Sequence, residues 1–183
     1  MDRRSWLIAA AAAPLVARAD EVADALKTGG VVIAFRHALA PGTFDPPNFQ
    51  PGVCSTQRNL SDEGRAQARR IGAWFTQRGL TPAAVKSSPW CRCIDTAQLA
   101  FGRAEPWAAL GSPRGTEERT YGEQITQLRG ALQAVPPGRF EVWVTHMFVL
   151  SDLASTHTSS GEGLVLRGRP GAAPAVLARL AIS

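Results

Sequence analysis

The chain has 183 residues, of which 45% are hydrophobic and 19% are charged, and its 20 basic and 15 acidic residues give a net charge of +5. This length and composition predict one folded domain with a sizeable core, and they exclude a disordered chain or a collagen-like repeat. The positive charge favours anionic partners, but the basic residues are scattered without a long run, so we expect no binding of nucleic acid.

Residues 1–19 have the pattern of a secretory signal peptide. A basic start containing Arg3 and Arg4 precedes a short apolar stretch, and Ala17-Arg18-Ala19 forms an Ala-x-Ala cleavage site. The apolar stretch is shorter than the roughly 20 residues of a membrane span, so we expect no stable span. We predict that residues 20–183 form the mature protein, periplasmic or secreted, with a short N-terminal helix as the alternative. The paired arginines leave the Sec and twin-arginine export routes both open.

Short apolar runs alternate with longer amphipathic stretches along the rest of the chain. In chain order, the pattern predicts a strand over 31–35, a loop over 40–52, a helix over 61–79, a strand over 83–88 and a helix from Ser88 and Pro89 to about Phe101. It then predicts a helix over 117–134, a strand over 140–145, a helix from about residue 146, and closing strands over 163–167 and 175–182. This alternation predicts an α/β fold, a three-layer sandwich of a mostly parallel β-sheet with helices on both faces.

Three of the predicted strands end in polar residues that suit phosphate chemistry. One ends at Arg36-His37, one at Ser87-Ser88 with Arg92 a turn further on, and one at Thr145-His146. The carboxyl ends of parallel strands meet at one sheet edge, where open α/β sheets bind ligands. Arginine forks match phosphate oxygens, a helix start adds a favourable dipole, and a neutral histidine can attack phosphorus. The pattern therefore predicts an anion pocket with a nucleophile and no metal, in which a phosphohistidine forms.

The three cysteines leave two interpretations open. In an oxidising compartment Cys54 can pair with Cys91 or with Cys93, which leaves one thiol free. Alternatively, all three are small buried side chains. The Cys91-x-Cys93 spacing is not that of a zinc site and no histidine is nearby in sequence, so we expect no bound metal and no cofactor.

Four segments, taken together, resemble the histidine phosphatase superfamily, which has the phosphoglycerate-mutase-like fold. Phe35-Arg36-His37-Ala38 looks like its Arg-His-Gly motif, and residues 60–68 are similar to its first helix after the active-site loop. Residues 87–97 resemble its second arginine motif, and Val144-Thr145-His146 matches the strand end that carries its second histidine. The resemblance implies that His37 is the nucleophile and that Arg36, Arg92 and His146 bind the phosphoryl group and stabilise its transition state.

Two positions depart from the family pattern. Residue 38 is Ala where Gly is usual, which removes access to positive φ. The glutamate that many members carry ahead of the second histidine is missing, since Leu110-Gly111-Ser112 supplies none. A poor leaving group still needs a proton donor. Asp45 is the first candidate for this general acid, with Glu117 or Glu118 behind it, and a turn-forming role is the alternative for Asp45.

Two further polar residues are not assigned to the site. Arg58, which precedes a predicted helix, is either a ligand of the substrate phosphate or a solvated side chain. His157 lies in a Ser- and Thr-rich stretch without a matching partner, so we expect it at the surface.

The resemblance implies an exported phosphatase that hydrolyses a phosphate monoester through a phosphohistidine on His37, without a metal. Its substrate is expected to be a small-molecule or glycan phosphate ester. Short, exported, cysteine-bearing members are similar to enzymes proposed to act on sugar phosphates of the lipopolysaccharide core, which suggests a sugar phosphate. The alternative is a non-catalytic phosphate- or glycan-binding module on the same fold. The missing glutamate favours this alternative, whereas a nucleophilic His37 argues against it. The sequence does not determine the oligomeric state.

Overall fold

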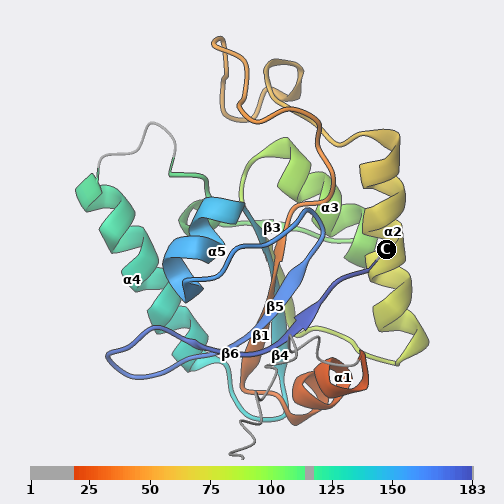
Figure 1. The fold of residues 1–183 in the computed structure, drawn as a ribbon, viewed down its shortest axis with the longest axis vertical. Helices are drawn as coiled ribbons and strands as arrows, with labels where there is room; N and C mark the ends of the chain where they lie inside the picture. Colours follow the sequence, from red (N-terminus) through yellow and green to blue (C-terminus); the bar gives the residue numbers. More distant parts are fainter. Residues whose placement is uncertain (1–18, 114–117, 183) are drawn as a thin grey trace, which may run out of the picture.

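The computed structural model of the chain describes residues 19–113 and 118–182. The predicted signal peptide, apart from Ala19, and the candidate acid Glu117 lie outside the described residues. In these two ranges, a sheet of six strands in the order β3-β2-β4-β1-β5-β6 forms the centre of the fold, and helices lie on both of its faces (Figure 1). In the same ranges, no helix is both long enough and apolar enough to cross a membrane.

The elements follow one another along the chain in the predicted order. They are α1 (Ala19–Thr28), β1 (Val31–Arg36), η1 (Cys54–Thr56), α2 (Asp62–Gln77), β2 (Ala84–Ser87), α3 (Cys91–Phe101), β3 (Glu105–Pro106), η2 (Ala108–Leu110), α4 (Glu118–Ala134), β4 (Phe140–Thr145), α5 (Met147–Ala154), β5 (Gly163–Arg167) and β6 (Ala175–Leu180). All the predicted strands and helices are present, while α1, β3 and the short 3-10 helices η1 and η2 are additional to the prediction.

The sheet is mixed but mostly parallel. Parallel pairing joins β1 to β4, β4 to β2 and β2 to β3, whereas β5 pairs antiparallel with both β1 and β6. Helices α1, α2 and α3 pack on one face of the sheet, and α4 and α5 pack on the other (Figure 1). The structure therefore confirms the predicted three-layer α/β fold.

Strand β1 is buried on both faces. Val31, Ile33 and Phe35 pack in the core beneath α1, α2 and α3, whereas Val32 and Ala34 pack in the core beneath α4 and α5. A central parallel strand that is covered on both sides is expected to be a continuous apolar run, which is why the sequence reveals it clearly. The first polar residues after this run therefore lie at the carboxyl edge of the sheet.

The segment that follows β1 crosses the start of α2 at close range. The Ser61 hydroxyl caps α2 by accepting a hydrogen bond from the Gly64 N–H at 3.1 Å, and the Ser61 N–H donates to the Leu39 carbonyl at 3.1 Å. A Cβ on Gly64 would lie 2.0 Å from the Leu39 carbonyl oxygen, so only glycine permits this approach. The predicted cap of α2 is confirmed, and its contacts fix the path of the chain just after His37.

The predicted start of the next helix, with Ser88 as cap and Pro89 as first residue, is wrong. Helix α3 begins at Cys91, and its N-cap is Trp90 in an extended conformation. The Ser88 N–H donates to the Val144 carbonyl at 2.8 Å, which keeps Ser88 aligned with the sheet. Tertiary hydrogen bonding therefore delays the helix beyond the position that local sequence favours.

Candidate active site

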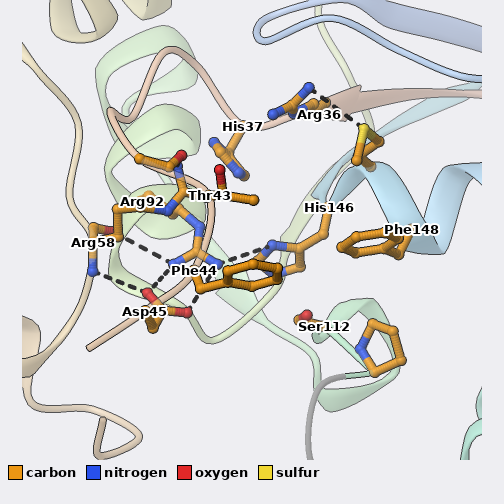
Figure 2. Close-up of a pocket in the computed structure, with 13 residues that line it drawn as sticks. Arg36, His37, Thr43, Phe44, Asp45, Arg58, Arg92, Ser112, His146 and Phe148 are labelled. Carbon is orange, nitrogen blue, oxygen red and sulfur yellow. Dashed lines mark hydrogen bonds and ion pairs between the residues drawn. The ribbon is translucent and has the colours of Figure 1, made fainter. Parts of the chain in front are cut away.

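Three neighbouring strands end at one edge of the sheet, and each brings functional side chains there. Strand β1 supplies Arg36 and is followed by His37, and β4 is followed by His146. Arg92 lies in the first turn of α3, directly after β2. Together with Asp45, from the loop after β1, these side chains line a cavity of about 420 Å³ (Figure 2). The structure thus brings all five predicted site residues together, and their catalytic roles stay predictions.

His37 is held in a form that suits a nucleophile. Its side chain is buried, and its Nδ1 lies 2.8 Å from the Ala38 carbonyl oxygen. Because a carbonyl can only accept, Nδ1 carries the proton and Nε2 keeps its lone pair. Burial lowers the pKa of His37 to about 3, against the hydrogen bond to Ala38, and the positive charges of nearby arginines lower it further. The imidazole is therefore neutral at neutral pH.

Ala38 replaces the usual glycine without backbone strain. Among the described residues other than glycine, only Ser155 has a positive φ, so Ala38 does not need the conformational freedom of glycine. Ala38 is fully buried, and its N–H donates to the Thr96 hydroxyl at 3.0 Å. That hydroxyl in turn donates to the Arg92 carbonyl at 2.7 Å, which ties the segment after β1 to α3.

His146 is the second buried imidazole of the site. Its Nδ1 lies 3.5 Å from the Arg92 Nη2, which can only donate, so Nδ1 accepts and Nε2 carries the proton. Nε2 lies 2.8 Å from the Ser88 hydroxyl oxygen and donates to it. Burial, followed by the charges of Arg92 and His37, holds the pKa of His146 well below its usual range. Ser88, which the sequence suggested as a helix cap, instead orients this ring.

Arg92 and Asp45 form a buried ion pair with two contacts. Arg92 Nη1 lies 2.8 Å from Asp45 Oδ1, and Nη2 lies 3.3 Å from Oδ2. The Arg58 N–H also donates to Asp45 Oδ1 at 2.9 Å. Burial by itself would raise the pKa of Asp45, but the hydrogen bond from Arg58 and the charge of Arg92 outweigh it and lower the pKa. As the carboxyl lies here it is ionised, so a role as general acid requires this ion pair to open.

The arginines that line the cavity each have an unsatisfied guanidinium donor. Arg36 Nη1 donates to the Thr158 carbonyl at 3.0 Å, and Arg58 Nη1 donates to the Gly42 carbonyl at 2.9 Å. In the described part of the chain, however, the Nε atoms of Arg36, Arg58 and Arg92 are buried without a hydrogen-bond partner. Buried polar groups are normally paired. Each of these arginines therefore keeps one unpaired guanidinium donor, and Arg58 both shapes the loop after β1 and lines the cavity.

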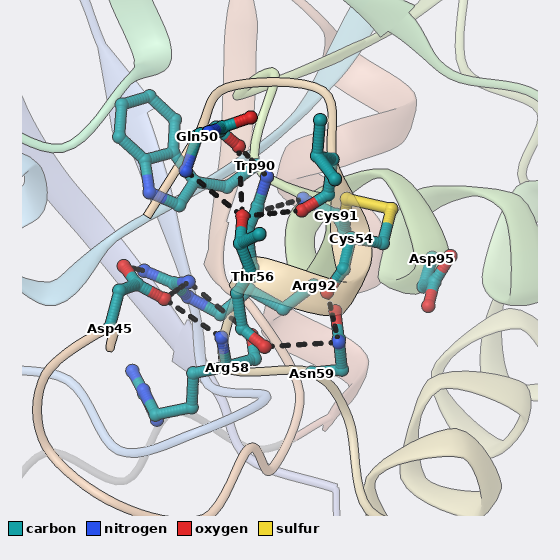
Figure 3. The surroundings of a disulfide bond; sticks show 12 residues. Asp45, Gln50, Cys54, Thr56, Arg58, Asn59, Trp90, Cys91, Arg92 and Asp95 are labelled. Atoms are coloured by element: carbon teal, nitrogen blue, oxygen red, sulfur yellow. Dashed lines mark hydrogen bonds and ion pairs between the residues drawn. A yellow bond between two sulfur atoms is a disulfide. The ribbon is translucent and has the colours of Figure 1, made fainter. Parts of the chain in front are cut away.

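A disulfide joins the two segments that carry the ion pair. Cys54, in the loop after β1, is bonded to Cys91, the first residue of α3, with their Cα atoms 5.6 Å apart (Figure 3). The Cys91 N–H also donates to the Gln57 side-chain oxygen at 3.0 Å. Of the two predicted pairings, the structure therefore has the one with Cys91. Cys93 is a buried free thiol whose Sγ lies 3.6 Å from His146 Nε2.

No carboxyl stands at the position of the missing family glutamate, since Leu110-Gly111-Ser112 occupies it. Ser112 and Pro113 line the cavity in that part of the chain. Glu117 lies outside the described residues, and although Glu118 begins α4, its side chain is not described either. Asp45 is thus the one candidate acid that the structure places in the cavity.

Two aromatic residues that no sequence pattern predicted lie at the cavity. Phe44 lies in the loop after β1 and Phe148 lies in the first turn of α5, and both line the cavity (Figure 2). Neither belongs to a periodic apolar pattern, since Phe44 follows a Pro- and Gly-rich segment and Phe148 lies on the exposed side of a short helix. One signal in the sequence could have found them. Phe44 directly precedes the candidate acid Asp45, and Phe148 follows His146 by two residues.

Acid is expected to destabilise the fold through the buried histidines. Histidine has a pKa of about 6.5 in an unfolded chain, whereas the pKa of His37 is about 3 in the fold. Between these values the unfolded chain binds more protons, so the free energy of unfolding falls as the pH falls. For His37 alone the loss between pH 7.5 and pH 5 is about 2 kcal/mol, and His146 adds to it in the same direction.

Denaturant unfolding at both pH values measures this loss. The matched variant His37→Gln is expected to lose about 2 kcal/mol less over the same interval, because it has no imidazole to protonate. Equal losses in the two proteins would contradict the low pKa of His37.

Comparison with known proteins agrees with this fold. The model of the histidine phosphatase superfamily, branch 1, matches residues 50–152, which is more than half of the chain. The chain belongs to the histidine phosphatase superfamily, and this membership supports phosphatase activity in general.

Solved structures similar to this chain share its fold at low sequence identity. SixA of Agrobacterium tumefaciens is 20% identical, with a TM-score of 0.54 over 85% of this chain and 99% of that one. The alpha-ribazole phosphatase of Shigella flexneri is 12% identical, with a TM-score of 0.57 over 76% and 91%. The mycobacterial glucosyl-3-phosphoglycerate phosphatase is 14% identical, with a TM-score of 0.56 over 80% and 97%. No curated protein sequence matches the chain significantly.

Proposed function

We propose that this protein is an exported phosphatase that hydrolyses a phosphate monoester through a phosphohistidine on His37. One observation carries the proposal. A buried neutral imidazole with its Nε2 lone pair available lines the same cavity as the guanidinium side chains of Arg36 and Arg92. A nucleophile and an anion site in one cavity are what attack on a phosphate ester requires, and binding alone would need only the second.

The reaction has two balanced steps. In the first, the His37 Nε2 lone pair forms a bond to phosphorus, the bond from phosphorus to the ester oxygen breaks, and that oxygen takes a proton. In the second, water attacks phosphorus and gives one proton to the group that protonated the ester oxygen, the N–P bond breaks, and hydrogen phosphate leaves with His37 neutral again. The guanidinium groups of Arg36 and Arg92, beside His146, stabilise the charge on the phosphoryl oxygens in both steps. Because the arginines supply the positive charge, the proposed reaction needs no metal.

Asp45 is proposed to supply the proton after the substrate has bound. The phosphate and the Asp45 carboxylate are both anions that compete for Arg92. When phosphate takes the guanidinium, Asp45 keeps the hydrogen bond from Arg58 but loses the ion pair that also lowers its pKa, and it gains a negative neighbour. Both of these changes raise its pKa. The carboxyl can then hold the proton that an alkoxide leaving group needs.

The variant Asp45→Asn separates this role from simple support of Arg92. We expect kcat/KM for an alkyl phosphate to fall about 100-fold, because its leaving group needs an acid, while that for nitrophenyl phosphate changes less than about threefold. Steady-state phosphate release with both substrates makes the comparison. Equal losses on the two substrates would show that Asp45 serves only to hold Arg92, and no loss on either would move the acid to Glu117 or Glu118.

Export is proposed on two features of the chain. The signal-like pattern of residues 1–19 ends in the Ala-x-Ala cleavage site. The disulfide between Cys54 and Cys91 is typical of an oxidising compartment such as the periplasm.

Phosphate release by the purified exported protein from a panel of phosphate monoesters, with EDTA present, tests the proposed function. Hydrolysis of several esters is expected, with sugar phosphates among them. The rival function is a binding module that takes phosphate or a glycan without reaction. It is favoured by one observation, the ionised state of the only candidate acid that the structure places in the cavity. Binding of phosphate without turnover of nitrophenyl phosphate, which needs no acid, would establish the rival.

A further inference from the structure

The cavity has an aromatic side that the proposed chemistry does not use. Phe44 and Phe148 line it with 67% and 49% of their surfaces exposed, and Met147 and Pro113 add further apolar surface. Figure 2 shows the two phenyl rings beside His146, on the side of the cavity that is away from Arg36 and His37. Large apolar side chains left open at a pocket mark surface that a ligand covers.

The charged groups of the cavity form a cluster of their own. Among the described lining residues, the charged ones are Arg36, Asp45, Arg58 and Arg92, and the last three contact one another. The phenyl rings carry no charge, and the hydroxyls of Thr43 and Ser112 are uncharged donors of the same lining that the proposed chemistry does not use. These rings and hydroxyls are the groups left to meet the rest of an ester whose phosphate the arginines hold.

The geometry points to Phe44 and Phe148 as specificity-determining residues for the leaving group, an inference that rests on the proposed function. We propose that they hold a single uncharged ring with an apolar face, as found in a sugar or an aryl alcohol. A ring laid against a phenyl group buries apolar surface on the face that it presents, and the hydroxyls can meet polar groups on its rim. The cavity volume of about 420 Å³ falls in the range of pockets that enclose a small organic ligand.

Single variants of the two rings test the assignment on paired substrates. We compare kcat/KM for phenyl phosphate and a hexose phosphate with that for glycerol phosphate, an acyclic ester, in the full exported protein. Phe44→Ala and Phe148→Ala are each expected to lower the ring-bearing values about fivefold to tenfold, mainly through KM. The glycerol phosphate value is expected to change less than about twofold, because an acyclic chain cannot stack on a phenyl ring.

Two matched variants complete the design. Phe148→Tyr keeps the ring face and is expected to retain the preference for ring-bearing esters. Leu177→Ala removes an exposed apolar side chain of β6, which is 40% exposed and does not line the cavity, and is expected to change nothing. A fall in kcat/KM confined to the hexose ester would identify the leaving group as a sugar, and a fall confined to phenyl phosphate would identify it as an aryl alcohol. Both results support the proposal.

The outcome that overturns the inference differs from the one that overturns the proposed function. If kcat/KM falls equally for ring-bearing and acyclic esters, or falls for neither, the phenyl rings do not select the substrate. The proposed phosphatase activity would be unaffected by that result. Failure of the unaltered protein to hydrolyse any of the three esters would instead count against the proposed function itself.

Discussion

His37→Ala is expected to lower kcat by about 10⁴-fold or more, whichever ester is used, because it removes the atom that bonds to phosphorus. The other groups of the site stay in place, so phosphate binding is expected to persist. Steady-state phosphate release measures the loss, and unfolding curves check that the variant folds.

His157→Ala is the matched control for this loss. His157 is exposed and does not line the cavity, so removal of its imidazole is expected to leave kcat unchanged. Retention of a tenth or more of the activity by His37→Ala would contradict a nucleophilic role for His37.

Arg92→Ala is expected to lower kcat/KM by about 10³-fold and to destabilise the fold. The site loses a guanidinium that stabilises the phosphoryl oxygens, and removal of one such donor typically costs a factor of 10² to 10³. Asp45 is then left as a buried carboxylate without its partner, which typically costs about 3–5 kcal/mol. Arg92→Lys keeps the charge but not the planar fork, so most of the loss in activity is expected to remain.

The double variant Arg92→Ala with Asp45→Asn separates the two effects. It removes both charges of the ion pair, so we expect it to recover much of the lost stability and none of the lost activity. Arg167→Ala, which removes an exposed arginine at the end of β5, controls for the change in net charge. Recovery of activity in the double variant would show that Arg92 serves the fold and not the phosphoryl group.

The sequence was most informative where one local pattern determines an element. Strands β1 and β4 are buried on both faces, so their apolar runs mark their limits closely, and the polar residues that follow them line the site. The start of α2 was predicted from Ser61, because its hydroxyl caps the helix locally.

Contacts between distant segments account for what the sequence did not determine. The start of α3 was misplaced because Ser88 bonds to His146 and to β4, neither of which local sequence reveals. Cys91 and Cys93 are two residues apart on a helix, and so project in nearly opposite directions. Which of them meets Cys54 depends on the path of the loop after β1. The ion pair of Asp45, 47 residues from Arg92, likewise depends on that loop.

Trapping of the covalent intermediate tests the central claim most directly. The protein is mixed with a radiolabelled phosphate ester and quenched in alkali within a turnover, since an N–P bond survives base better than acid, and the labelled peptide is then identified. We predict up to one phosphoryl group per chain, attached to His37 and absent from His37→Ala. Turnover without label at His37, or label that persists in His37→Ala, would contradict the account.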